Sequence, residues 1–194
     1  FPHPRHIQRA VTILQAGGLI AYPTDTYYAI GCDMASRAAV EALTELKHRD
    51  SKKPFAVLCS DLAEAAKYAL IGNEQYRLMR RLVPGPYTFI LDGTRDVART
   101  VINKRRQVGI RIPDAPIALA LVRGLGRPLA TTSAQLPDGE ICLDAQEVQD
   151  RIGHGVELIL DGGATLVEAS TVLDLTGPQA VVLREGKGPV EGLL

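Results

Sequence analysis

The chain has 194 residues, of which 46% are hydrophobic and 23% charged, and its formal net charge is zero. This composition is that of a globular protein, so it excludes disordered, collagen-like and coiled-coil chains, and the length predicts one domain over residues 1–194. No apolar run reaches the roughly 18 residues of a membrane span, and the opening FPHPRHIQRA has no hydrophobic signal core, so we expect neither a membrane span nor a secretory leader. Three cysteines without CxxC spacing fit a reducing cytoplasm better than a disulfide framework or a zinc site.

In chain order, helical spacing of apolar residues alternates with short apolar runs. The helical spacing and its capping residues predict helices over 6–16, from Ser36 to Leu46, over 62–68 and 74–82, from Pro116 to Arg123 with Gly124 as the end, and from Asp144 to Ile152. The apolar runs predict strands over 19–23, 27–30, 55–58, 87–91, 108–112, 128–132, 157–161, 170–175 and 180–184.

The connections between these strands set the fold class. Strands and helices are mixed along the chain, which is typical of an α/β protein. The links between 22 and 27 and between 175 and 180 are too short for a crossover helix, so those strand pairs must be antiparallel. We therefore expect a mixed parallel and antiparallel sheet flanked by helices.

The zero net charge is the sum of three unlike segments. Residues 1–76 carry eight basic and eight acidic side chains, residues 77–127 eleven basic and three acidic, and residues 128–194 three basic and eleven acidic. A middle segment at +8 and a last segment at −8 indicate either an anion site or two segments that pair with each other.

Polar residues stand where several predicted strands end. The turn at 24–26 (Thr-Asp-Thr) is either a capped turn or the rim of a pocket for a small polar ligand. After it, Lys47, Arg49, Lys52 and Lys53 lie between a helix and a buried strand, where they suit either the helix dipole or phosphate clamping.

Two further strand ends carry candidate site residues. Arg111 interrupts an apolar strand and shares one of its faces with Gly109, so it either faces solvent or lines a cleft in which the glycine leaves room for a ligand. The small residues 131–134 follow an apolar run, either as an ordinary loop or as hydroxyl and N–H donors to an anion. No P-loop, GxGxxG, HExxH or GxSxG motif is present.

Motifs extend over most of the chain, in a fixed order. They are GGLIAYPTDT at 17–26, Lys47 with Arg49, PGPYTF at 84–89, IRIP at 110–113, SAQ at 133–135, STVLD at 170–174 and LREGKG at 183–188. Together they resemble the YrdC-like family, whose members make threonylcarbamoyl-AMP for the t6A modification of tRNA. The resemblance implies a twisted mixed sheet around a large, positively charged cavity.

The resemblance also implies a reaction and its residues. Threonine and bicarbonate would give a carbamate that attacks the α-phosphate of ATP, in the manner of a nucleotidyltransferase, with Mg²⁺ bound to the nucleotide. The threonine part would be held by Thr26, Arg111, Thr131 and Ser170. The nucleotide would be held by Lys53, Ser133, Gln135 and Arg184, with Lys47 and Arg49 as the catalytic pair.

Some positions depart from the synthase pattern. Gln135 stands where synthases carry Asn, and Leu58 stands where they often carry His. These departures, with the Pro-Asp-Gly loop at 137–139, are more similar to the YciO branch of the family.

Alternatives to the synthase remain. One is a relative that hydrolyses the same adenylate. Another is a module that binds double-stranded RNA or tRNA through the basic residues of 77–106, above all Arg80, Arg81, Arg105 and Arg106. The third is a relative without a ligand, in which Glu140, Glu147 and Asp150 would neutralise the basic middle segment.

Overall fold

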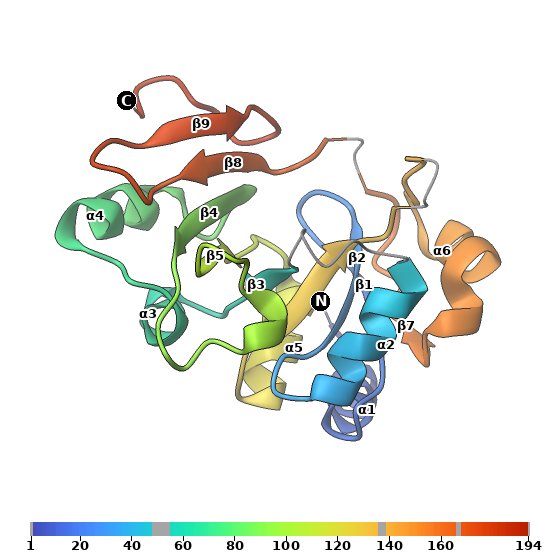
Figure 1. Cartoon of the computed structure of the whole chain (residues 1–194). Coiled ribbons are helices and arrows are strands. Elements are labelled where there is room, and N and C mark those ends of the chain that lie inside the picture. Colours follow the sequence, from blue (N-terminus) through green and yellow to red (C-terminus); the bar gives the residue numbers. More distant parts are fainter. Residues whose placement is uncertain (1, 48–54, 136–138, 166–167, 194) are drawn as a thin grey trace.

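The computed structural model describes residues 2–47, 55–135, 139–165 and 168–193, and these ranges share one nine-stranded sheet with the order β7-β1-β2-β6-β3-β5-β4-β8-β9 (Figure 1). The strands are β1 (Ile20–Pro23), β2 (Tyr28–Asp33), β3 (Ala56–Leu58), β4 (Tyr87–Asp92), β5 (Gln107–Arg111), β6 (Leu129–Ser133), β7 (Leu158–Ile159), β8 (Thr171–Asp174) and β9 (Val181–Arg184). The helices are α1 (Pro4–Gln15), α2 (Arg37–Lys47), α3 (Leu62–Tyr68), α4 (Asn73–Leu82), α5 (Pro116–Leu125) and α6 (Ala145–Ile152), with 3₁₀ turns at Arg99–Val101 and Gly153–Gly155.

The pairing of the strands confirms the predicted mixed sheet. β1 with β2 and β8 with β9 are antiparallel, as their short connections require. The pairs β3–β5, β4–β8 and β1–β7 are parallel. Because β6 lies between β2 and β3 and is antiparallel to both, it joins the N-terminal hairpin to the centre of the sheet.

The helices cover the two faces of the sheet unequally. α2, α3, α4 and α6 contribute buried residues to the larger core on one face. On the other face α1 and α5 pack together over β1 and β2, at the bottom of the view in Figure 1, whereas β8 and β9 lie at the top. In the described ranges, no helix therefore covers the second face over the half of the sheet that contains β4, β5 and β8.

Two predicted helix starts, at Asp61 and Asp144, are confirmed by their caps, whereas the first helix begins at Pro4 rather than at residue 6 and the predicted end at Gly124 is wrong. The side chains of Asp61 and Asp144 each accept a hydrogen bond from the backbone N–H three residues later, at 2.8 Å. α5 continues through Gly124 and ends at Gly126, whose φ of 79° suits the left-handed position that closes a helix. Position 124 lies inside the helix and needs a glycine, because a Cβ there would come within 2.8 Å of Val11 on α1.

The strand predicted over 157–161 is shorter than expected. Only Leu158 and Ile159 of the predicted 157–161 run pair with β1, in the strand β7 at the edge of the sheet. In the described part of the chain, no helix has the length and apolar character needed to cross a membrane.

Candidate functional site

A cavity of about 650 Å³ lies on the half of the sheet that α1 and α5 leave uncovered. Ala29 and Leu58 belong both to the core under those helices and to the cavity wall, so the cavity continues the same face of the sheet. Seven predicted site residues line it: Thr26, Arg111, Thr131, Ser133, Gln135, Ser170 and Arg184. The sheet thus brings together residues that are up to 158 positions apart in the sequence.

Arg111 lies in the cavity wall, on the strand face that the alternation predicts. Val108, Ile110 and Ile112 are buried in the core beneath the sheet, and Gly109 lines the cavity beside Arg111. The Arg111 side chain is only 11% exposed, so it does not face open solvent. The cleft interpretation of Arg111 is the one that holds.

A buried carboxylate fixes the Arg111 guanidinium. Nη2 donates to Oδ1 of Asp25, whose side chain is 5% exposed, and Oδ2 of Asp25 accepts from the backbone N–H of Asp114 at 2.9 Å. Nη1 donates to Thr26 Oγ1 at 3.3 Å, and Nε is buried with no hydrogen-bond partner among the described residues. Pairing with Asp25 offsets the cost of taking the arginine charge out of water and sets the direction of its donors.

The turn between β1 and β2 holds itself together and also forms the cavity rim. Thr24 Oγ1 donates to the carbonyl of Tyr27 at 2.6 Å and accepts from the N–H of Thr26 at 3.1 Å. Thr26 is buried, and its hydroxyl lies 3.1 Å from that of Thr24. The segment is therefore a capped turn that also forms part of the cavity rim, because the capped geometry places Thr26 in the wall.

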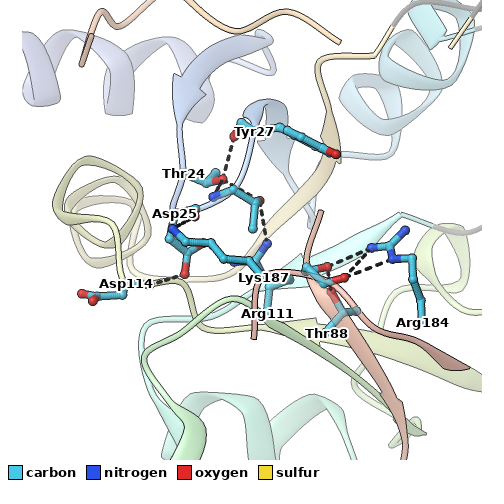
Figure 2. A network of polar contacts seen from close by, with 10 residues as sticks. Thr24, Asp25, Tyr27, Thr88, Arg111, Asp114, Arg184 and Lys187 are labelled. Carbon is cyan, nitrogen blue, oxygen red and sulfur yellow. Dashed lines mark hydrogen bonds and ion pairs between the residues drawn. The ribbon is translucent and has the colours of Figure 1, made fainter. Parts of the chain in front are cut away.

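The opposite wall centres on Ser170, immediately before β8. Its hydroxyl lies 2.8 Å from Thr88 Oγ1, and Arg184 Nη2 donates to it at 3.1 Å. Arg184 also donates from Nε and Nη2 to the Ser170 carbonyl, at 3.0 and 2.9 Å (Figure 2). The guanidinium therefore positions Ser170 and lines the cavity at once.

The third wall is the end of β6. Thr131 Oγ1 lies 2.6 Å from the hydroxyl of Tyr22, a fully buried residue on β1. Burial raises the pKa of the Tyr22 phenol, so this group stays protonated. A Cβ on Gly31 would lie 2.7 Å from that hydroxyl, which explains the glycine in the middle of β2. The neutral phenol can therefore orient the Thr131 hydroxyl from the core under α1 and α5.

Comparison with known proteins places this site in a family. A family model described as telomere recombination, for Sua5, YciO and YrdC proteins, matches residues 12–186. The chain belongs to the Sua5/YciO/YrdC family. The resemblance that the motifs predicted is thereby confirmed.

Three relatives represent the branches of the family. YciO of Escherichia coli is 41% identical over 195 residues, covering all of this chain and 95% of that protein, and its crystal structure gives a TM-score of 0.94. The threonylcarbamoyl-AMP synthase of Vibrio vulnificus is 31% identical over 160 residues, or 81% of this chain and 86% of that protein. P. abyssi Sua5 complexed with L-threonine is 32% identical with a TM-score of 0.88, over 93% of this chain and 54% of that chain.

Four of the residues predicted for catalysis or nucleotide binding lie at or after the ends of α2 and β6. Lys47, at the end of α2, contacts the end of β6, where its Nζ donates to the carbonyls of Ser133, at 2.9 Å, and Gln135. The predicted residues Arg49 and Lys53 lie outside the described residues. The Gln135 amide donates to the Gly139 carbonyl at 3.1 Å.

Sequence reasoning missed three residues of this family site. Thr88 lies inside the quoted PGPYTF motif, and Lys187 occupies the variable position of LREGKG. Lys187 Nζ donates to the Asp25 carbonyl at 2.5 Å. Tyr22 lies in the quoted opening motif, but only the structure shows that its hydroxyl contacts Thr131.

The arginines predicted for RNA binding lie on the surface, away from the cavity. Arg80, Arg81, Arg105 and Arg106 are exposed and do not line the cavity, whereas Arg111 and Arg184 do. Among the described residues, Glu140 pairs with Arg151, and no ion pair joins the basic middle segment to Glu147 or Asp150. Cys32, Cys59 and Cys142 are free and buried, and burial raises their pKa values.

Proposed function

We propose that this chain acts on threonylcarbamoyl-AMP, forming it from ATP, L-threonine and bicarbonate for the t6A modification of tRNA. The observation that carries the proposal is the convergence of Thr26, Arg111, Thr131, Ser133, Ser170 and Arg184 on one cavity. Family membership, the synthase of V. vulnificus and the L-threonine complex of P. abyssi Sua5 support it. E. coli YciO is similar along nearly its whole length, so the proposal bears on that branch as well.

The chemistry needs positioning rather than a covalent nucleophile. The amine of threonine attacks bicarbonate and water leaves, which gives a carbamate. A carbamate oxygen then attacks the α-phosphorus of ATP, and the bond to the β-phosphate breaks with release of pyrophosphate. A site that aligns the two reactants and neutralises the developing phosphoryl charge accelerates this step.

The arrangement of the walls supports an amino-acid end and a nucleotide end that meet. Thr26, Arg111 and Ser170 would hold the amino acid, together with Thr131. Ser133 and Arg184 would face the nucleotide, with Lys47, Arg49 and Lys53 on its phosphates. Arg184 contacts Ser170 directly, so the proposed ends adjoin at the place where carbamate and phosphate must join.

The cations of the site would supply its positive charge, and Mg²⁺ would enter with ATP. The charged side chains among the described lining residues are Arg111 and Arg184. No group of three or more His, Cys, Asp or Glu side chains suited to a metal occurs in the described ranges. The phosphate oxygens of ATP, together with water, would provide ligands of the ion.

The direct test is incubation with ATP, L-threonine and bicarbonate, with the nucleotide products separated by chromatography. The wild type should release pyrophosphate and accumulate threonylcarbamoyl-AMP, or consume added threonylcarbamoyl-AMP if the equilibrium favours breakdown. A Lys47→Ala/Arg49→Ala variant should lose this activity, whereas Arg37→Ala, in an exposed pair with Glu41, should keep it. Equal turnover by the double variant and the wild type would remove the proposal.

A second function, binding of double-stranded RNA or tRNA, is favoured by one observation. Arg80 and Arg81 on α4 and Arg105 and Arg106 before β5 are exposed outside the cavity. Contacts to phosphates release counterions, so such binding should weaken steeply between 50 and 200 mM salt, by roughly 10³-fold or more for six contacts. An affinity that salt leaves unchanged would contradict this function.

A further inference from the structure

The segment that follows β9 runs along residues 169–171, next to the Ser170 wall of the cavity. The N–H of Lys187 donates to the Ala169 carbonyl at 2.8 Å, and the N–H of Gly186 donates to Thr171 Oγ1 at 3.0 Å. Thr171 Oγ1 in turn donates to the Gly188 carbonyl at 2.6 Å. Thr171 is fully buried, so these contacts fix the backbone of residues 186–188 from the inside of the protein.

The two segments approach so closely at Gly186 that a larger side chain does not fit there. A Cβ at this position would lie 2.3 Å from the Ala169 carbonyl oxygen and 2.7 Å from the Ser170 backbone. Both are backbone atoms that cannot move aside without displacing the start of β8. The path of the chain from Arg184 to Gly188 is thus determined by contacts independent of any ligand.

Two cationic side chains leave this fixed segment toward different walls of the cavity. Arg184 reaches Ser170, as described above. Lys187 reaches the turn between β1 and β2, 162 residues earlier, where Nζ donates to the Asp25 carbonyl (Figure 2). Among the described residues Lys187 has no carboxylate within ion-pair distance, so its ammonium serves a backbone oxygen alone.

The Asp25 carbonyl is a sensitive point at which to hold the turn. The peptide group that it belongs to leads directly into Thr26, and the Asp25 carboxylate orients Arg111. A shift of this peptide therefore moves both a hydroxyl and a guanidinium of the amino-acid end. The same fixed segment holds Ser170 through Arg184, so residues 184–188 set the separation of two walls of the cavity.

We propose that Lys187 is a positioning residue for the amino-acid end of the cavity. It acts through Asp25 on Thr26 and Arg111, and with Arg184 it makes residues 184–188 a clamp across the site. This inference rests on the proposed function, because it assigns the held turn to the binding of L-threonine. Removal of the ammonium should weaken threonine binding and leave ATP binding nearly unchanged.

The test compares Lys187→Met with Lys187→Arg in the full chain, and uses Lys67→Met, at an exposed lysine of α3, as the matched control. Hydrogen bonds to a charged donor are strong enough that Lys187→Met should raise KM for L-threonine roughly tenfold, with less than about a twofold change in KM for ATP. Lys187→Arg keeps a cationic donor and should restore most of the threonine affinity. Lys67→Met should match the wild type in both constants.

A second measurement does not depend on turnover. Hydrogen exchange at the Thr26 amide, which donates to Thr24 Oγ1, reports how firmly the turn is held. Lys187→Met should speed exchange at Thr26 while leaving the core amides of β5 unchanged. Gly186→Ala, which displaces the whole segment, should raise KM for threonine further than Lys187→Met does.

The outcomes separate the two proposals. If Lys187→Met changes both KM values equally, or if threonine KM and Thr26 exchange are both unchanged, Lys187 does not position the turn. If wild-type protein neither forms nor consumes threonylcarbamoyl-AMP and does not bind L-threonine in calorimetry, the proposed function falls. In that case a change in Thr26 exchange would still show the contact but would deny it a role in substrate binding.

Discussion

The β1–β2 hairpin carries an arginine–aspartate pair at each end, and the two pairs are built differently. At the cavity end, Arg111 divides Nη2 and Nη1 between Asp25 and Thr26 and leaves Nε without a partner. At the far end, Arg127 directs Nε and Nη2 at the single carboxylate of Asp33, at 2.6 to 2.9 Å. The exposed fractions are 11% and 5% for the first pair and 46% and 4% for the second.

The difference separates a pair that holds a fold from one that prepares a site. Arg127 donates from Nε and Nη2 to Asp33, and the rest of its side chain is open to water. Asp33 also accepts from the Ala35 N–H beyond the end of β2. This end of the hairpin therefore has a purely structural arrangement. Arg111 is nearly buried and its donors are shared among several groups, so it contributes to the fold and also retains capacity for a ligand.

The largest expected effect concerns stability. Asp25→Ala leaves the Arg111 charge buried and unpaired, which should lower the free energy of unfolding by about 3–5 kcal/mol. Asp33→Ala leaves Arg127 close to water and should cost only about 1–2 kcal/mol. Urea unfolding at pH 7 measures both values.

The comparison fails if the two losses are equal. Asp25→Asn serves as a second variant in case Asp25→Ala does not fold. Its amide oxygen can still accept one hydrogen bond, so it should lose less stability than Asp25→Ala. A full loss in Asp25→Asn as well would mean that the negative charge, rather than the acceptor, is what Arg111 requires.

The second prediction uses the arginines themselves, in the threonylcarbamoyl-AMP assay. Arg111→Lys keeps the charge but cannot donate to Asp25 and Thr26 at the same time. The value of kcat/KM for threonine should therefore fall roughly 10- to 100-fold. Arg127→Lys should lose some stability and keep the catalytic constants of the wild type. Equal catalytic losses in the two variants would show that the cavity end has no special role.

How far the sequence predicts these ends follows from the range of the contacts. Alternation along β5 was sufficient to place Arg111 and Gly109 on one face, and local capping signals located α3 and α6. The pairing of Arg111 with Asp25 depends on folding across 86 residues, and no local pattern announces it. The sequence predicts Gly124 as a helix end, but a glycine is needed there because α1 approaches closely. That contact is equally non-local. Lys187 stood at a variable motif position, so only the structure shows its contact.

The smallest effect concerns the groups that titrate at the two ends of the hairpin. Burial raises the pKa of Cys32, beside Asp33, to about 12, and burial also raises the pKa of Tyr22, beneath the cavity. In the unfolded chain a cysteine ionises near pH 8.5 and a tyrosine near pH 10, so above these values the unfolded state binds fewer protons than the folded state. Stability should therefore be constant with respect to these groups below about pH 8 and fall as the pH rises.

The expected slope distinguishes the two ends. Each group should reduce the free energy of unfolding by up to about 1.4 kcal/mol per pH unit above its unfolded pKa. Cys32→Ala should make the decline shallower from about pH 9, and Tyr22→Phe should do so only above about pH 10. Urea unfolding at pH 7, 9 and 10.5 measures both slopes. If neither variant changes the slope, water reaches these side chains. The conclusion that a buried, neutral Tyr22 orients Thr131 would then be wrong.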